Sequence, residues 1–119
     1  MLPVLESIAV CFVAFLHIGF FLLEMFFWKK PVGRKIFGLN KEFAEQSATL
    51  AANQGLYNGF LAAGLLWSFF IDGFAYEVRF FFLLCIIIAG VFGAITVSRT
   101  ILWVQTLPAV IALTLVVMN

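Results

Sequence analysis

The stretch VLESIAVCFVAFLHIGFFLLEMFFW, residues 4–28, followed by Lys29, Lys30 and Pro31, decides the fold of this chain. It is apolar over the roughly 17–25 residues that a helix needs to cross about 30 Å of hydrocarbon. Three similar stretches follow, and we expect helices at about 4–28, 41–71, 80–97 and 101–118. The period-two alternation of a membrane β-barrel strand is not present. The sequence therefore predicts an all-α integral membrane four-helix bundle, with residues 1–119 forming a single domain.

The composition supports a membrane protein. The chain has 119 residues, of which 65% are hydrophobic and 11% are charged, whereas a soluble globular protein has roughly 25% charged residues. The net charge of +1 argues against a nucleic-acid partner. The first apolar stretch lacks a basic n-region, so we expect a retained helix rather than a signal peptide. Cys11 and Cys85 lie in apolar segments, so we expect two buried hydrophobic side chains rather than a disulfide.

The basic residues predict the orientation in the membrane. Lys29, Lys30, Arg34, Lys35 and Lys41 lie between the first two apolar stretches, and Arg99 follows the third. The positive-inside rule places both of these loops in the cytoplasm and both termini outside. A multi-pass protein of the plasma membrane is therefore expected, with the lipid bilayer as its first partner.

The ends of the second helix and its small residues carry further signals. Asn40 resembles an N-cap, followed by Glu42 and Glu45 in the favoured acidic first turns, so the helix is expected to begin near Lys41. Small residues, which allow close packing of membrane helices, recur every four positions in two helices (Ala51, Gly55, Gly59 and Ala63; Gly90 and Ala94). We expect these stripes to form packing seams, and we expect a homo-oligomer, a dimer or a trimer. Pro108 predicts a kink beside Gln105.

Six candidate polar side chains lie within the apolar stretches, and a seventh, Arg99, lies just after the third stretch. They are His17, Glu24, Asn53, Gln54, Asn58, Arg99 and Gln105. Counted from the cytoplasmic ends at about 1.5 Å per residue, Glu24, Asn53, Gln54 and Gln105 lie roughly 6–9 Å deep, whereas His17 and Asn58 lie roughly 15–16 Å deep. Arg99 stands at the cytoplasmic mouth. The pattern predicts a polar shaft that opens to the cytoplasm and closes near the middle of the membrane.

These seven residues are the candidate ligand-binding or proton-linked groups, because hydrocarbon offers them no hydrogen-bond partner. The first hypothesis is a protein that binds or transports a small polar or amphipathic molecule, or a lipid. The second is a membrane-embedded enzyme that acts on a lipophilic substrate, with Glu24 or His17 as the acid–base group. The third is a structural protein in which the same residues hold helices together, Glu24 by pairing with a loop cation and His17 by bonding Asn58.

Metal and cofactor sites are not expected. His17 and Glu24 are two helical turns apart, so their Cα atoms are separated by about 10 Å, which is too far for easy coordination of one ion. The sequence has no CxxC motif, no phosphate-binding loop and no nucleophile–base pair. We therefore predict neither a metal nor a cofactor.

A family resemblance covers nearly the whole chain. Its signature includes Leu16-His17, Leu23-Glu24-Met25-Phe26, Lys30-Pro31, the run from Ala51 to Phe60 (AANQGLYNGF) and the run from Val104 to Ala109 (VQTLPA). The sequence resembles the bacterial membrane family catalogued as domain of unknown function thirteen-hundred-and-four. That resemblance implies a small four-span bacterial membrane protein and assigns no chemistry.

A weaker likeness concerns layout alone. The four spans and the polar residues near the cytoplasmic end of the second helix are similar to those of membrane-associated eicosanoid and glutathione metabolism proteins. Those proteins are trimers with lipophile sites between subunits. The charged pattern of their second helix is not reproduced between Ala48 and Asn58, so glutathione chemistry does not follow.

Overall fold

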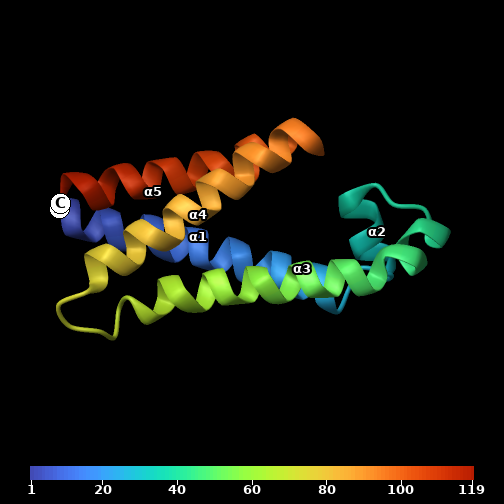
Figure 1. The fold of residues 1–119 in the computed structure, drawn as a ribbon, viewed down its shortest axis with the longest axis horizontal. Coiled ribbons are helices and arrows are strands. Elements are labelled where there is room, and N and C mark those ends of the chain that lie inside the picture. The colour runs from blue at the N-terminus through green and yellow to red at the C-terminus, as the bar shows by residue number, and fades with distance from the viewer. The chain divides into compact units, whose positions relative to one another are not determined.

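The computed structural model describes all 119 residues, and every regular element in it is helical (Figure 1). The elements are α1 (Leu2–Met25), α2 (Pro31–Phe37), α3 (Lys41–Trp67), α4 (Ala75–Thr96), a π-helical turn η1 (Leu102–Thr106) and α5 (Leu107–Met118). The predicted all-α class is confirmed. By length and composition, α1 and α4 could each cross a membrane, and residues Leu102–Met118 form a shorter apolar helix.

The two longest apolar helices expose most of their surface. Only 22% of the apolar window of α1 and 17% of that of α4 is buried. Phe12, Phe15, Ile88 and Phe92 are each more than half exposed. The core helix of a soluble protein would bury most of such a surface, because large contiguous apolar patches are rare on soluble monomers. The exposed surface therefore favours a lipid environment.

The segment between α1 and α3 contains a helix that the sequence pattern did not predict. Pro31 occupies the first turn of α2, where a missing N–H costs nothing. Gly38 follows the helix with φ of 66°, the left-handed conformation that glycine adopts without steric cost. A helix of seven residues is too short to show a clear periodicity. The predicted N-cap of α3 is confirmed, because the backbone N–H of Phe43 donates to Asn40 Oδ1 at 2.7 Å.

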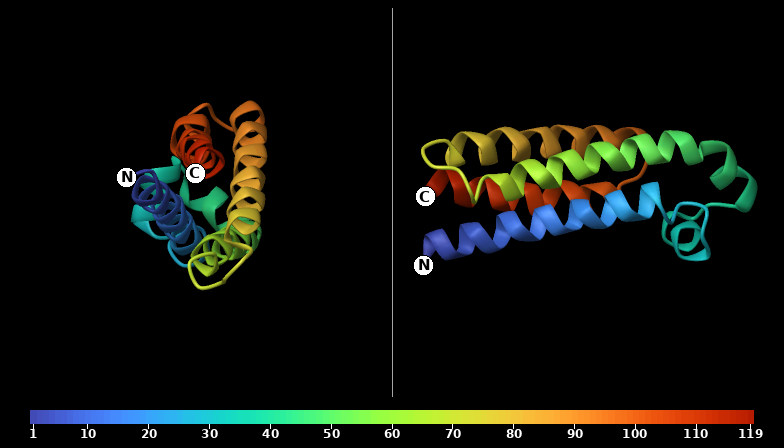
Figure 2. Two further views of the ribbon diagram at one scale, coloured as in Figure 1. Left: turned by 90° about the vertical axis from the view of Figure 1, so that its left-hand side faces the viewer. Right: turned by 90° about the horizontal axis from the view of Figure 1, so that it is seen from below.

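The chain divides into two compact units. Unit 1 comprises residues 1–16 and 61–119. Within it, α4 and α5 run side by side, and the two termini lie at the same end (Figures 1 and 2). Its core is one apolar cluster contributed by its parts of α1, α3, α4 and α5: Val10, Val13, Ala14, Leu65, Leu83, Ile86, Ala109, Ala112 and Val116.

Unit 2 comprises residues 17–60 and contains the end of α1, all of α2 and most of α3. Trp28, in the turn after α1, contacts both α2 and α3. Its indole N–H donates to Ser47 Oγ in α3 at 3.0 Å, and its ring lies 4.9 Å from that of Phe37 in α2. Figure 2 shows α2 folded beside the start of α3.

The small-residue stripe of α3 is buried at Ala51 and Gly55, half-buried at Gly59 and exposed at Ala63, whereas Ala62 is buried. The reason is helical geometry. Each step of four residues overshoots a full turn by about 40°, so a stripe read every four residues has rotated by about 120° after three steps. The expected packing seam is therefore correct for the first half of α3 and wrong at Ala63.

A π-helical turn stands where a kink was expected near Pro108. The N–H of Leu107 bonds the carbonyl of Leu102, five residues earlier. Proline has no N–H to bond the carbonyl four residues back, and its ring crowds that carbonyl, so a wider turn before Pro108 relieves the crowding. Thr106 in this turn is buried, and its Oγ1 lies against Gly90 of α4.

Candidate functional site

The clearest polar contact in unit 2 joins Glu24 of α1 to Asn58 of α3. The Asn58 amide donates a hydrogen bond of 2.5 Å to Glu24 Oε1. Asn58 is 5% exposed, and Glu24 is half-buried. The one ion pair of the structure involves neither residue. The structural hypothesis had paired Glu24 with a cation of the loops. In the structure, Glu24 is instead hydrogen-bonded to the amide of Asn58.

Gly55 brings the two helices close enough for this contact. A Cβ atom at Gly55 would lie 3.1 Å from Glu24 Cβ, from the backbone N of Met25 and from the carbonyl O of Phe21. Two of these three atoms are backbone, which cannot move aside as a side chain can. The absence of a side chain at Gly55 therefore sets the distance at which Asn58, one turn further along α3, reaches Glu24.

His17 is fully buried and lies two turns before Glu24 on α1. Its ring packs edge-to-face against that of Phe20, with 5.2 Å between the centroids. The amide of Asn58, expected to serve His17, donates to Glu24 instead. The spacing of seven residues keeps His17 and Glu24 on one side of the helix.

Asn53 and Gln54 are exposed in α3. They lie on the same helix as Asn58, yet neither is part of the contact with Glu24. Asn53 shares the exposed side of the helix with Gln46, Leu50, Tyr57 and Phe60, because these positions recur at steps of three and four residues. This polar–aromatic stripe, Gln46, Leu50, Asn53, Tyr57 and Phe60, is unpartnered in the single chain.

The last two candidates, Arg99 and Gln105, belong to unit 1. Arg99 is exposed in the turn after α4. Gln105, in the π-helical turn, donates from Nε2 to the backbone carbonyl of Ile86 in α4 at 3.3 Å. The single polar shaft that joins all four helices remains a prediction. Cys11 and Cys85 are free and half-buried, and no group of three potential metal ligands is present.

Sequence reasoning missed a second polar cluster, at the end of unit 1 where the two termini lie. Arg79 Nη1 forms an ion pair of 2.8 Å with Glu6 Oε1, and Arg79 Nε donates to Ser68 Oγ at 2.8 Å. Its guanidinium also lies 4.3 Å from the ring centroid of Phe69. The amide of Asn119 donates to the other oxygen of Glu6. Glu6 and Ser68 are almost completely buried.

One signal pointed toward this cluster. Glu6 is a carboxylate inside an apolar stretch and requires a partner there. The predicted helix 80–97 excludes Arg79 because the apolar run begins only at Phe80, whereas α4 starts at Ala75 and carries Arg79 on its second turn. Helix boundaries are the least certain part of a sequence pattern, and here the boundary concealed the partner.

Comparison with known proteins identifies relatives without an assigned activity. A family model described as "Protein of unknown function (DUF1304)" matches residues 11–117. The chain is 32% identical over 93 residues to a protein of Lactococcus lactis subsp. lactis (strain IL1403) named "Uncharacterized protein YpaA". The match covers 76% of this chain and 78% of that relative. No solved structure matches.

The family model spans the residues that carried the resemblance, including Glu24, Asn58 and Gln105, and the predicted family is confirmed. The chain belongs to the family described as Protein of unknown function (DUF1304).

Proposed function

We propose that this protein is a four-span protein of the bacterial plasma membrane that binds or transports a small polar or amphipathic molecule. Helices α1, α3 and α4 and the continuous segment η1–α5 are the four spans. The loops after α1 and α4 face the cytoplasm, and both termini face outward. The exposed apolar surfaces of α1 and α4 and the basic residues of the two loops support this arrangement.

Helix α3 fits a span that projects beyond the membrane. Its first turns carry Lys41, Glu42 and Glu45, all exposed. The remaining length, from Leu50 to Trp67, corresponds to about 27 Å at 1.5 Å per residue, which suffices for a bilayer core. The polar start of α3 then lies on the cytoplasmic side, among the basic residues of the first loop.

The hydrogen bond between Glu24 and Asn58 carries the functional proposal. A carboxyl group at a helix interface within hydrocarbon is costly unless it is paired, protonated or used. Glu24 accepts a hydrogen from an amide but takes part in no ion pair. It therefore offers an acceptor whose charge a proton or a cationic ligand neutralises. His17, two turns deeper on the same helix and fully buried, is the second candidate for a proton-linked group.

The exposed side of α3 supports assembly as a homo-oligomer. Asn53 lies in the part of α3 proposed to cross the membrane, and its amide would face hydrocarbon in a monomer. Interhelical hydrogen bonds between copies would satisfy it, at about 1–2 kcal/mol for each bond. The stripe of Gln46, Leu50, Asn53, Tyr57 and Phe60 alternates in steps of three and four residues, which is the spacing of a helix–helix seam.

A structural role is the second candidate. The hydrogen bond from Gln105 to the Ile86 carbonyl supports a structural role, because it joins the π-helical turn η1 to helix α4. In this reading the Glu24–Asn58 bond also serves only to hold α1 and α3 together. The two candidates predict different results for Glu24→Gln, since a glutamine still accepts the Asn58 hydrogen but exchanges no proton.

Proteoliposomes distinguish these candidates. Vesicles with an internal pH indicator would be exposed to a panel of amino acids, amines and short amphiphiles. The transport proposal expects at least one compound to move protons in the wild type, no movement with Glu24→Gln, and normal movement with Glu42→Gln, an exposed control. If no compound moves protons, or if Glu24→Gln transports as the wild type does, proton-linked transport is wrong. Loss of stability alone in Asn58→Ala and Glu24→Ala would favour the structural role.

A further inference from the structure

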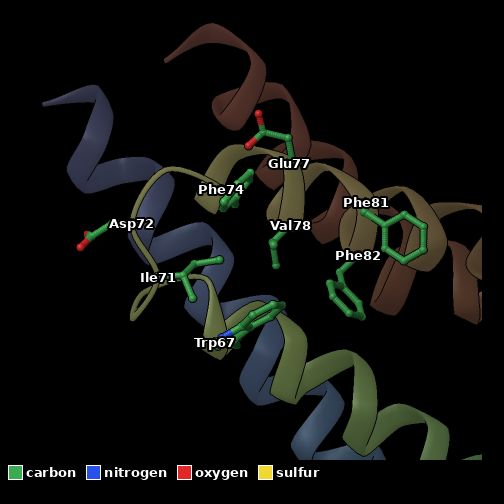
Figure 3. Close-up of a pocket in the computed structure, with 8 residues that line it drawn as sticks. All are labelled: Trp67, Ile71, Asp72, Phe74, Glu77, Val78, Phe81 and Phe82. Atoms are coloured by element: carbon green, nitrogen blue, oxygen red, sulfur yellow. The ribbon is translucent and has the colours of Figure 1, made fainter.

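A cavity of about 590 Å³ lies in unit 1, at the junction of α3 and α4. It is formed by the end of α3, the connection that follows and the first two turns of α4 (Figure 3). Its size falls within the roughly 300–1,000 Å³ of small-molecule sites. The residues that line it are Trp67, Ile71, Asp72, Phe74, Glu77, Val78, Phe81 and Phe82.

The lining combines aromatic rings with two carboxylates. Figure 3 shows Trp67, Phe74 and Phe82 around the cavity, with Val78 and Ile71 between them. Trp67, Phe74 and Phe81 are each more than half exposed, so the cavity opens to its surroundings. The carboxylates of Asp72 and Glu77 lie at the outer rim and point away from the rings. A molecule in the cavity would meet an apolar interior and a negatively charged edge.

The negative charge at this edge is not neutralised within the structure. Arg79 is the cation of α4, and its guanidinium is engaged by Glu6, Ser68 and the Phe69 ring. Neither Asp72 nor Glu77 forms an ion pair. Both are exposed. The rim therefore attracts cations and repels anions, whereas the charge of Arg79 is cancelled by Glu6.

The positions of these groups along α4 match the shape of an amphiphile. Glu77 is in the first turn of the helix, and Phe81 follows one turn later, about 6 Å further along the axis. In the proposed topology this direction leads from the outer surface into the hydrocarbon. A charged group at the rim would thus have its apolar part alongside Phe81 and Phe82.

We propose that this cavity is a binding site for a small amphipathic organic ammonium ion. The ammonium group lies at the outer edge of the cavity, where the negative charges of Asp72 and Glu77 attract it, and the apolar part lies between Trp67 and Phe82. A free amphiphile fits better than a choline phospholipid, because the lipid's phosphate would be brought beside two carboxylates. The site is separate from Glu24, and the binding itself depends neither on the proposed transport nor on the proposed orientation.

Titration of the purified full-length protein in maltoside micelles tests the proposal. The probe is octyltrimethylammonium, with octanesulfonate as the probe of opposite charge, and the signal is tryptophan fluorescence. We expect a saturable change with the cation, no such change in Trp67→Phe, and no saturable binding of the sulfonate. Since Asp72 and Glu77 are exposed, raising the salt concentration should weaken the affinity of the wild type.

Variants locate the binding. We expect Asp72→Asn/Glu77→Gln to weaken the affinity for the cation about tenfold, as the loss of two rim charges predicts. Glu42→Gln/Glu45→Gln, which removes two exposed carboxylates of α3 elsewhere, should bind as the wild type does. Equal binding of octanesulfonate, an unchanged affinity in the double rim variant, or an affinity independent of salt would each overturn the proposal. The salt series uses the wild type alone, so a poorly folded variant does not decide the outcome.

Discussion

The amide of Asn58 on α3 donates its hydrogen to the carboxyl group of Glu24 on α1, across a helix interface that Gly55 makes narrow. The pair unites two residues that are 34 positions apart in the sequence. It also replaces two expected contacts, the one between Glu24 and a basic residue of the loops and the one between Asn58 and His17.

Replacing Asn58 with leucine should destabilise the fold by about 1–2 kcal/mol, because Glu24 then keeps a half-buried carboxyl group without its donor. Unfolding in mixed detergent micelles, followed by circular dichroism, measures the change. Thr114→Val is the control, because Thr114 is exposed, makes no contact with Glu24 and bonds only the Val110 carbonyl of its own helix. Equal losses in the two variants would show that the hydrogen bond does not stabilise unit 2.

Adding a side chain at Gly55 should force the end of α1 away from α3. Gly55→Val is expected to cost about 1–3 kcal/mol, the range for overpacking a closely fitted site, because the new Cβ meets the backbone at Phe21 and Met25. The same unfolding assay measures this cost.

Gly19 supplies the control for this experiment, because a Cβ there would meet nothing within 4 Å. Gly19→Ala should leave stability unchanged or raise it by about 0.5–1 kcal/mol, since alanine is the better helix former. A Gly55→Val protein as stable as Gly19→Ala would contradict the close approach of α1 and α3.

Removing Arg79 should be the most damaging single change to unit 1. Arg79→Leu leaves the carboxylate of Glu6, which is 4% exposed, buried without its cation, and breaking such a pair costs about 3–5 kcal/mol. Glu6→Gln in the same chain should recover part of this loss, because it removes the uncompensated charge. Arg99→Leu, at an exposed arginine, should have little effect. A double variant less stable than Arg79→Leu would contradict the pairing.

Asn53→Leu should reduce self-association while leaving the monomer folded. The exposed Asn53 amide is the polar group on the stripe of α3 that a second copy would satisfy within the membrane. Crosslinking in lipid vesicles, followed by the mass of the products, measures the oligomer fraction. Thr114→Val is the control, because Thr114 is exposed but already bonds the Val110 carbonyl of its own helix. An undiminished oligomer fraction in Asn53→Leu would exclude this stripe as the interface.

Much of the fold followed from local sequence. Apolar length predicted α1, α4 and α5, Asn40 predicted the start of α3, and Pro108 predicted a disturbance in the last helix. Each depends on residues close together in the chain, because helix hydrogen bonds and caps are local. The sequence pattern did not predict the short helix α2 or the early start of α4, since neither of them extends an apolar run.

The sequence by itself determined which residues are polar among apolar ones, and therefore that Glu6, Glu24 and Asn58 need partners. The tertiary structure decided who those partners are. It joined Asn58 to Glu24 through the close approach at Gly55, and it joined Glu6 to Arg79, 73 residues later. The physical reason is that hydrogen bonds and ion pairs act over a few ångströms, so pairing depends on how helices pack and not on the depth of each residue along its own helix.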